Sequence, residues 1–152
     1  MIYKKSKTGV TCAMNGNSMP DEANTPEKNA STTRTKKIIL VAEDDEGIGT
    51  MLAHFISDET PYEVLLVTNA RRALQVVQEV KPALLLLDYH LPSMTGIQLY
   101  DQFQTIEALK DVPTIMMSAN LPTAELARRR ILGLKKPFDL DDLLDLIEKA
   151  LD

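Results

Sequence analysis

The sequence predicts an α/β fold in which helices cover both faces of a doubly wound, five-stranded parallel sheet. Five short apolar runs occur along the chain, and they do not alternate apolar with polar residues, so each is typical of a strand buried on both faces. Segments with helical periodicity lie between the runs, and a strand–helix alternation of this kind indicates a doubly wound arrangement. The five runs are 38–42, 64–67, 83–87, 114–117 and 131–134.

Three of the intervening segments carry a clear apolar stripe at helical spacing. The first stripe is Ile48, Met51, Leu52, Phe55 and Ile56. The second follows a Thr68-Asn69 cap and consists of Ala70, Ala73, Leu74, Val77 and Val80. The third is Leu140, Leu143, Leu144, Ile147 and Leu151, with Asp139 placed to cap its helix.

The first 36 residues differ from the rest of the chain. They are rich in Asn, Ser, Thr, Lys and Gly and have no apolar period. Such a segment cannot bury enough surface to offset its ordering entropy, so residues 1–36 are predicted to be a disordered extension. Residues 37–152 are predicted to form one domain, and no effector or DNA-binding domain is expected beside it.

Composition narrows the class of protein. Apolar residues make up 44% and charged residues 26% of the chain, an ordinary soluble balance. The single cysteine, Cys12, cannot form an internal disulfide, and neither a membrane span nor a secretory signal is visible. We therefore expect a cytoplasmic protein. The chain after residue 37 carries 10 basic and 19 acidic residues, and this acidic balance argues against nucleic acid as the main partner.

Polar residues follow the apolar runs, at the carboxyl ends of the predicted strands. Ligands of open α/β sheets bind at this edge, so these residues are expected to meet there. The segments are Glu43-Asp44-Asp45-Glu46, Asp88-Tyr89-His90-Leu91-Pro92, Ser118-Ala119-Asn120 and Lys135-Lys136-Pro137.

Carboxylates crowded at one point repel unless a cation neutralises them. Because the side-chain donors are all oxygen, the expected cation is Mg²⁺ rather than zinc. Asp88 is then a natural nucleophile that could form an aspartyl phosphate. Lys136 would neutralise charge on the phosphoryl oxygens, and Ser118 would donate a hydrogen bond to them.

Each piece also has a simpler interpretation. The acids at 43–46 could complement the positive end of the first helix. Gly47 and Gly49 suggest a phosphate loop, but Leu52 stands where the third glycine of a dinucleotide motif belongs, so that interpretation is rejected. His54 is expected to be a solvated surface residue. The ring of His90 could tune water access to the site or have only a loop role.

The chain resembles the response-regulator receiver family, which includes the single-domain chemotaxis regulator, over about residues 37–152. Four ordered motifs carry the resemblance: Ile39-Leu40-Val41-Ala42-Glu43-Asp44-Asp45, Leu87-Asp88-Tyr89-His90-Leu91-Pro92-Ser93-Met94-Thr95-Gly96, Met117-Ser118-Ala119 and Lys136-Pro137-Phe138. The resemblance implies the flavodoxin-like receiver fold, with strand order 2-1-3-4-5.

The resemblance also implies roles for individual residues. Asp44 would bind the metal directly and Glu43 through water. Asp88 would be phosphoacceptor and metal ligand, and the backbone carbonyl of His90 would complete the protein's share of the coordination. Ser118 and Lys136 would hold the phosphoryl oxygens, and the peptide bond between Lys136 and Pro137 would be cis.

The function implied is that of a stand-alone receiver in a two-component or phosphorelay system. A sensor histidine kinase or a histidine phosphotransfer protein would supply the phosphoryl group, and an unknown downstream protein would read the change. Such a chain is not an enzyme, since it catalyses at most its own phosphorylation and dephosphorylation.

The sequence departs from the family pattern at three points, and the first two bear on how the signal is read out. Gly133 stands where the family usually has an aromatic residue, one that swings inward on activation. The interval from Ser118 to Lys136 is about one helical turn shorter than usual, so a shortened fourth helix is expected between Pro122 and Arg130. Thr95 stands where Asp is frequent.

Two rival functions remain open. A pseudo-receiver would bind partners without ever carrying phosphate. A phosphatase of the haloacid-dehalogenase type would also use an aspartyl nucleophile and Mg²⁺. That family, however, has its nucleophile in a D-x-D motif on the first strand, and here His90 occupies the place of the second acid.

Overall fold

The structure is a computed structural model that describes residues 2–5 and 36–152. Its strands are β1 (Ile2–Lys5), β2 (Ile38–Ala42), β3 (Glu63–Val67), β4 (Leu84–Asp88), β5 (His90–Leu91), β6 (Met94–Thr95), β7 (Thr114–Ser118) and β8 (Leu132–Lys135). Its helices are α2 (Glu46–Glu59), α3 (Ala70–Val76), α4 (Gly96–Phe103), α5 (Thr123–Arg129) and α6 (Leu140–Leu151), with a short 3₁₀ turn, η2 (Glu107–Leu109).

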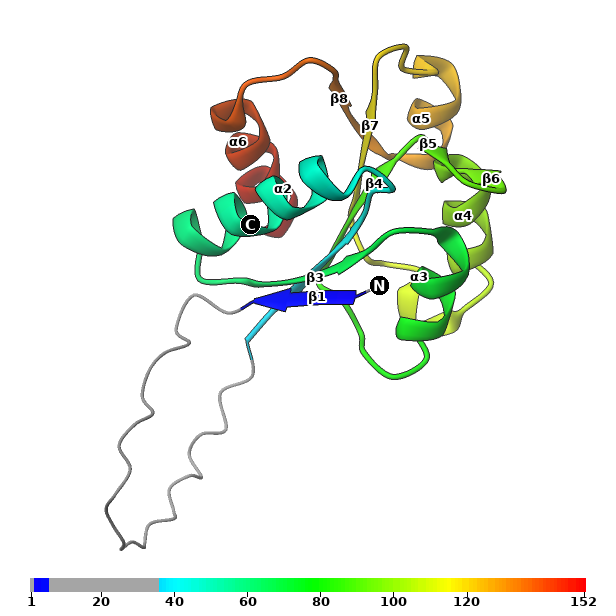
Figure 1. The fold of residues 1–152 in the computed structure, drawn as a ribbon. Helices are drawn as coiled ribbons and strands as arrows, with labels where there is room; N and C mark the ends of the chain where they lie inside the picture. The colour runs from blue at the N-terminus through cyan, green and yellow to red at the C-terminus, as the bar shows by residue number, and fades with distance from the viewer. Residues whose placement is uncertain (1, 6–35) are drawn as a thin grey trace, which may run out of the picture.

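The central sheet has the predicted parallel arrangement. Strands β3, β2, β4, β7 and β8 lie side by side in that order (Figure 1). Numbered along the chain as the five predicted strands, this is the order 2-1-3-4-5, so the predicted fold class is confirmed. Strand β3 follows β2 in the chain and lies on one side of it, whereas β4 lies on the other side. The direction in which strands are added to the sheet therefore reverses at β2. A doubly wound sheet binds its ligand at such a point, beside the strand ends.

A sixth strand was not predicted. β1 pairs antiparallel with β3 at the edge of the sheet, with Ile2 opposite Val67 and Lys5 opposite Val64. The expectation of a disordered extension is therefore wrong for residues 2–5, because an unpaired strand edge can recruit any extended segment through its backbone. Residues 6–35 of the predicted extension lie outside the described residues. The domain boundary at residue 37 stays a prediction.

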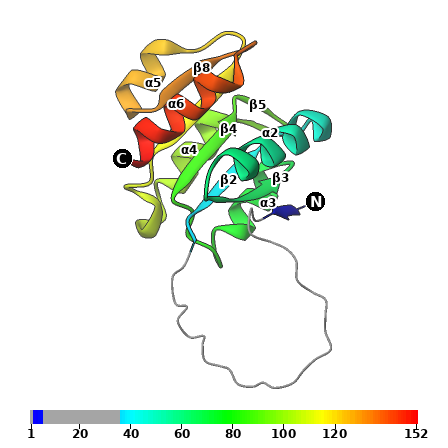
Figure 2. The same ribbon diagram turned by 90° about the vertical axis from the view of Figure 1, so that its left-hand side faces the viewer.

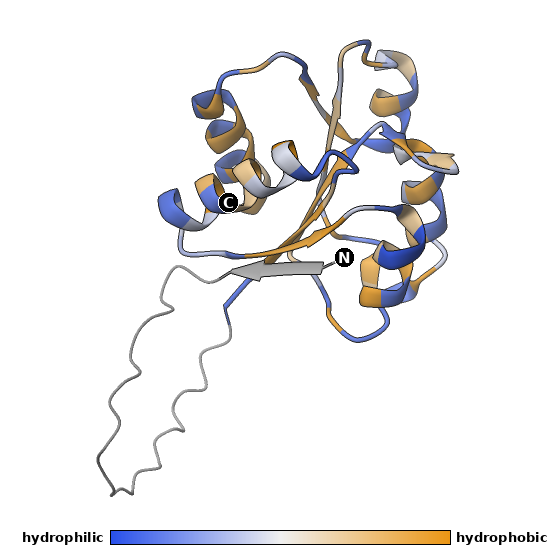
Figure 3. Ribbon diagram, in the orientation of Figure 1, coloured by the Kyte–Doolittle hydropathy of each residue, from blue (hydrophilic) through white to orange (hydrophobic). Residues whose placement is uncertain are grey.

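Helices cover both faces of the sheet, and each face has its own core (Figures 1 and 2). Helices α2 and α6 pack on one face, and α3, α4 and α5 pack on the other. Neighbouring residues of a strand point into opposite cores. In β2, Leu40 belongs to the core under α3 and α4, and Val41 belongs to the core under α2 and α6. Figure 3 shows the apolar colour concentrated in the central strands. This two-sided burial explains why the strand runs do not alternate.

Several helix details differ from the predicted stripes. Ile48 and Met51 are 36% and 44% exposed, so the buried face of α2 lies to one side of the predicted stripe. Asp139 occupies the N-cap position of α6, but its side chain makes no capping hydrogen bond. The short helix expected before β8 is present as α5, with seven residues. None of the described helices is both long and apolar enough to cross a membrane.

The start of α4 packs directly on the backbone at the end of β4. Thr95 and Gln98 form a reciprocal capping box, with N–H to side-chain distances of 2.9 and 3.1 Å. A Cβ atom on Gly96 would lie 2.6 Å from the carbonyl oxygen of Asp88 and 2.6 Å from the sulfur of Met116. Only glycine lets the helix approach this closely, so Gly96 helps to fix the backbone that carries the Asp88 side chain.

We expect Gly96→Ala to lower the free energy of unfolding by about 1–3 kcal/mol, the usual cost of overpacking a buried site. The control is Gly47→Ala in the first turn of α2, where the nearest atom to an added Cβ is the Asp45 Oδ1, at 3.3 Å. Chemical denaturation of the two variants measures the difference. Equal stability of the two variants would contradict the close packing at Gly96.

Candidate functional site

The site lies at the carboxyl ends of β2, β4, β7 and β8. Backbone hydrogen bonds continue the strand pairing into the residues that follow. The N–H groups of Glu43, Tyr89 and Lys136 donate to the carbonyl oxygens of Val67, Met117 and Ser118, at 3.0, 2.8 and 2.9 Å. The site residues are therefore held by the register of the sheet as well as by their loops.

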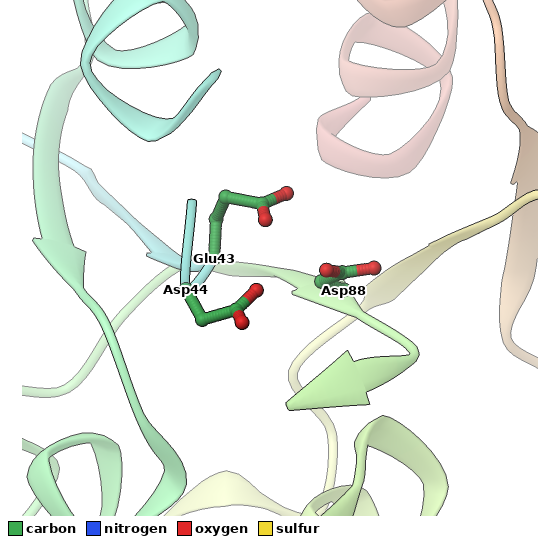
Figure 4. Close-up of side chains that lie close together, drawn as sticks. All are labelled: Glu43, Asp44 and Asp88. Carbon is green, nitrogen blue, oxygen red and sulfur yellow. The ribbon is translucent and has the colours of Figure 1, made fainter. Parts of the chain in front are cut away.

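Three carboxylates meet at this edge. Glu43 and Asp44 follow β2, and Asp88 ends β4 (Figure 4). One oxygen of each lies within 4.8 Å of the others. Glu43 and Asp88 are 1% and 4% exposed, whereas Asp44 is open to solvent. Two buried acids and one exposed acid thus surround a common space.

Lys136 connects the two buried acids. Its Nζ donates to Oδ1 of Asp88 at 3.2 Å and to Oε1 of Glu43 at 3.4 Å. Burial lowers the pKa of Lys136, but the negative charges of Glu43 and Asp88 raise it more, so the pKa lies above its usual value. The lysine therefore stays charged and offsets part of the repulsion between the acids.

Glu43 is the most perturbed acid of the group. Burial is the main reason that its pKa rises from 4.5 to about 7. The charge of Asp88 raises the pKa further, while the backbone N–H of Asp45 and the Lys136 ammonium lower it. One ammonium thus neutralises the buried acids only in part, so the cluster keeps an excess of negative charge.

The donor set suits a hard cation. Glu43, Asp44 and Asp88 offer only oxygen atoms, which is the ligand type of Mg²⁺ and Ca²⁺ rather than of zinc. The acidic cluster could therefore hold a metal ion.

The other predicted site residues lie nearby in different settings. Ser118 ends β7 and is buried, with its hydroxyl bonded to the backbone of Asn120 rather than directed at the acids. His90 is exposed at the start of the β5–β6 hairpin, and its ring meets Tyr89 edge-on, with the centroids 4.9 Å apart. Its backbone N–H points to Oδ1 of Asp88 at 3.5 Å. The roles expected for both residues stay predictions.

Several sequence features find a purely structural explanation. Asp45 caps α2 by accepting from the N–H of Ile48 at 2.9 Å, so it stands apart from the carboxylate cluster. Gly49 is buried against Leu66, where a Cβ would lie 2.9 Å from a methyl group, so its role is in packing. His54 lies exposed on α2.

Two contributors were not predicted from the sequence. Gly96 supports the Asp88 backbone, and its only signal in the sequence is its place at the end of the motif that begins at Leu87. Asn120 bonds to the Ser118 hydroxyl through its backbone atoms, so the identity of its side chain gives no signal for this contact. The expected cis peptide bond between Lys136 and Pro137 is present.

Comparisons with known proteins agree on one family. The sequence model of the response regulator receiver domain matches residues 39–148. Sporulation initiation phosphotransferase F of Bacillus subtilis is 30% identical over 117 residues, which cover 74% of this chain and 92% of that protein. The DNA-binding response regulator MtrA of Mycobacterium tuberculosis is 33% identical over 101 residues, but the match spans only 41% of MtrA.

Solved structures give the same result. The chemotaxis response regulator CheY4 of Vibrio cholerae superposes with a TM-score of 0.71 and 26% identity, over 77% of this chain and 100% of that chain. The receiver domain of HemR from Leptospira biflexa superposes with a TM-score of 0.70, also at 26% identity, over 77% of this chain and 95% of that one.

The pKa of Glu43 predicts how stability depends on pH without metal. Because the pKa is raised from 4.5 to about 7 on folding, the folded state binds more protons than the unfolded state between these values. Stability from this group is therefore fully present below pH 4.5 and is lost as the pH rises through about 7. The loss should be on the order of 1–3 kcal/mol.

Chemical denaturation in the presence of a chelator measures this dependence. Glu43→Gln should remove most of it, since glutamine does not titrate but can still accept from Asp45. Glu46→Gln, at an exposed position on α2, is the matched control and should keep the dependence of the unmodified chain. An unchanged slope in Glu43→Gln would show that the dependence arises elsewhere.

Proposed function

This chain belongs to the response-regulator receiver family, and from that premise we propose that it accepts a phosphoryl group on Asp88 in a two-component or phosphorelay pathway. The observation that carries the proposal is the position of Asp88, buried 3.2 Å from an ammonium group and clustered with two further carboxylates. The proposed domain comprises residues 37–152, and the proposed setting is the cytoplasm.

The phosphoryl donor would be a histidine kinase or a histidine phosphotransfer protein. A carboxylate oxygen of Asp88 forms a bond to phosphorus while the bond from phosphorus to the donor's imidazole nitrogen breaks. The electron pair leaves with the imidazole. The chain thus acts as a phosphoacceptor in signalling rather than as an enzyme on a separate substrate, and its phosphorylation changes which downstream protein it binds.

The chain's own groups have distinct parts in this transfer. The Lys136 ammonium already lies beside the nucleophilic carboxylate, where it can offset the charge on a phosphoryl oxygen. Asp44 and Asp88 would hold Mg²⁺ through carboxylate oxygens and Glu43 through water, and the backbone carbonyl of His90 would contribute a further oxygen. When bound, Mg²⁺ supplies neutralisation of the carboxylates and of the phosphoryl oxygens. Ser118 would donate a hydrogen bond to the phosphoryl group.

Intact-mass measurement after treatment with acetyl phosphate and Mg²⁺ tests the proposal. The unmodified chain should gain one phosphoryl mass, a chelator should suppress the gain, and Asp88→Asn should abolish it. The matched control is Asp45→Asn, one of the neighbouring acids, because asparagine caps a helix as well as aspartate and should leave labelling unchanged.

Full labelling of Asp88→Asn would contradict the proposed acceptor. A chain that folds and binds Mg²⁺ but never gains mass would favour the pseudo-receiver function. Steady turnover of a generic phosphomonoester would instead favour the phosphatase function.

An apolar groove beside the acceptor supports a protein as the donor. Ile48 and Met51 are the two large apolar side chains that the described residues leave exposed. They border a groove of about 500 Å³ whose other lining residues are Ala119, Lys136, Pro137, Phe138 and Leu140. Because Lys136 both lines this groove and bonds to Asp88, a donor seated in the groove would lie next to the acceptor carboxylate.

We therefore expect Met51→Lys to slow phosphoryl transfer from a phosphorylated histidine phosphotransfer domain at least about 10-fold, because it places a charge where an apolar interface anchor should be buried. Labelling by acetyl phosphate should be unchanged, because that small donor needs no docking surface. Thr50→Lys, an exposed position on the same helix, is the control for added charge. Equal slowing with both donors would mean that Met51 acts on the site itself.

A further inference from the structure

Strand β1 lies along the outer edge of β3 and reaches the end of that strand from which the acidic site is supported (Figure 1). The two strands run antiparallel, so Ile2 lies opposite Val67, the last residue of β3. At the other end of the pairing, Lys5 lies opposite Val64. The N-terminal segment therefore borders the part of β3 that leads to the carboxyl edge of the sheet.

The backbone groups of β3 bond to its two neighbours in alternation, as in any strand inside a sheet. The carbonyl oxygen of Val67 points toward β2, because it accepts from the N–H of Glu43 at 3.0 Å. The N–H and carbonyl of Leu66, one residue earlier, therefore point the other way, toward Tyr3 of β1. Release of β1 would leave these groups of Leu66 at an open sheet edge.

The last two residues of β3 also support the segment that carries the acids proposed to hold the metal. Val67 bonds to the backbone of Glu43. Leu66 packs against Gly49 in the first turn of α2, where an added Cβ would lie 2.9 Å from Cδ1 of the leucine. Asp44 lies in the chain between these two points of support. The acid-bearing segment thus rests on two residues that β1 holds from the opposite side.

We propose that the pairing of β1 with β3 and the binding of a metal ion at the acids are cooperative, an inference that rests on the proposed Mg²⁺ site. A paired β1 restricts Leu66 and Val67, so the segment with Glu43 and Asp44 has less freedom left to lose when an ion orders it. The coupling is reciprocal, because a bound ion that orders the same segment favours the pairing of β1. The N-terminal strand is thus a regulatory element, and its release lowers the occupancy of the site at a given Mg²⁺ concentration.

Two-dimensional NMR titration of full-length variants with MgCl₂ measures one half of the coupling. Tyr3→Pro removes the N–H that faces Leu66, so the Mg²⁺ affinity should fall at least about 5-fold. Tyr3→Ala lacks the same side chain but keeps this N–H, and should lose less affinity than Tyr3→Pro. Lys4→Pro is the matched control, because the N–H of Lys4 points away from β3, where an edge strand tolerates proline. Equal Mg²⁺ affinities of Tyr3→Pro and Lys4→Pro would overturn the inference and leave the proposed metal site intact.

Hydrogen exchange in the unmodified chain measures the other half. The amide of Leu66 points toward β1, whereas the amide of Leu65 points toward β2. Saturating MgCl₂ should slow exchange at Leu66 at least about 5-fold and should slow it less at Leu65. Equal slowing at both amides would mean that Mg²⁺ stabilises the whole domain without favouring β1, and would overturn the coupling. An unmodified chain that binds no Mg²⁺ would overturn the proposed metal site together with this inference.

Discussion

The ammonium of Lys136 bonds to two buried carboxylates, Glu43 and Asp88, that come from distant parts of the chain. Burying these charges is costly, and one positive charge offsets only part of that cost. The arrangement persists because the strands on either side are fixed by ladders of backbone hydrogen bonds and by two apolar cores. The fold thus provides the stability that holds an incompletely neutralised site in place, and a cation could neutralise the remaining excess of negative charge.

The backbone ladders of the sheet also connect the site to the rest of the domain. Backbone bonds carry the strand register into the residues after β2, β4 and β8, so the sheet fixes the backbone that carries Glu43, Asp88 and Lys136. Gly96, at the start of α4, packs closely against the backbone of Asp88. Ser118 is the exception, because its bonds are to the turn that follows it rather than to the acids.

Most of the fold was predictable because buried parallel strands leave continuous apolar runs, and the site acids follow those runs directly. The sequence could not indicate that Ile48 and Met51 face solvent, since a stripe at helical spacing does not reveal how much of it the neighbouring elements cover. Strand β1 was missed because it joins the sheet through backbone pairing at an edge, far in sequence from β3.

The central claim is that the carboxylate of Asp88, and no other acid in the cluster, receives the phosphoryl group. Sodium borohydride reduces an aspartyl phosphate to homoserine, so the acceptor can be read directly from peptide masses after acetyl phosphate treatment with Mg²⁺. Homoserine at position 88, with Asp44 and Asp45 unmodified, is the predicted result. Homoserine at either of those two positions, or at none in a chain that carries phosphoryl mass, would contradict the account.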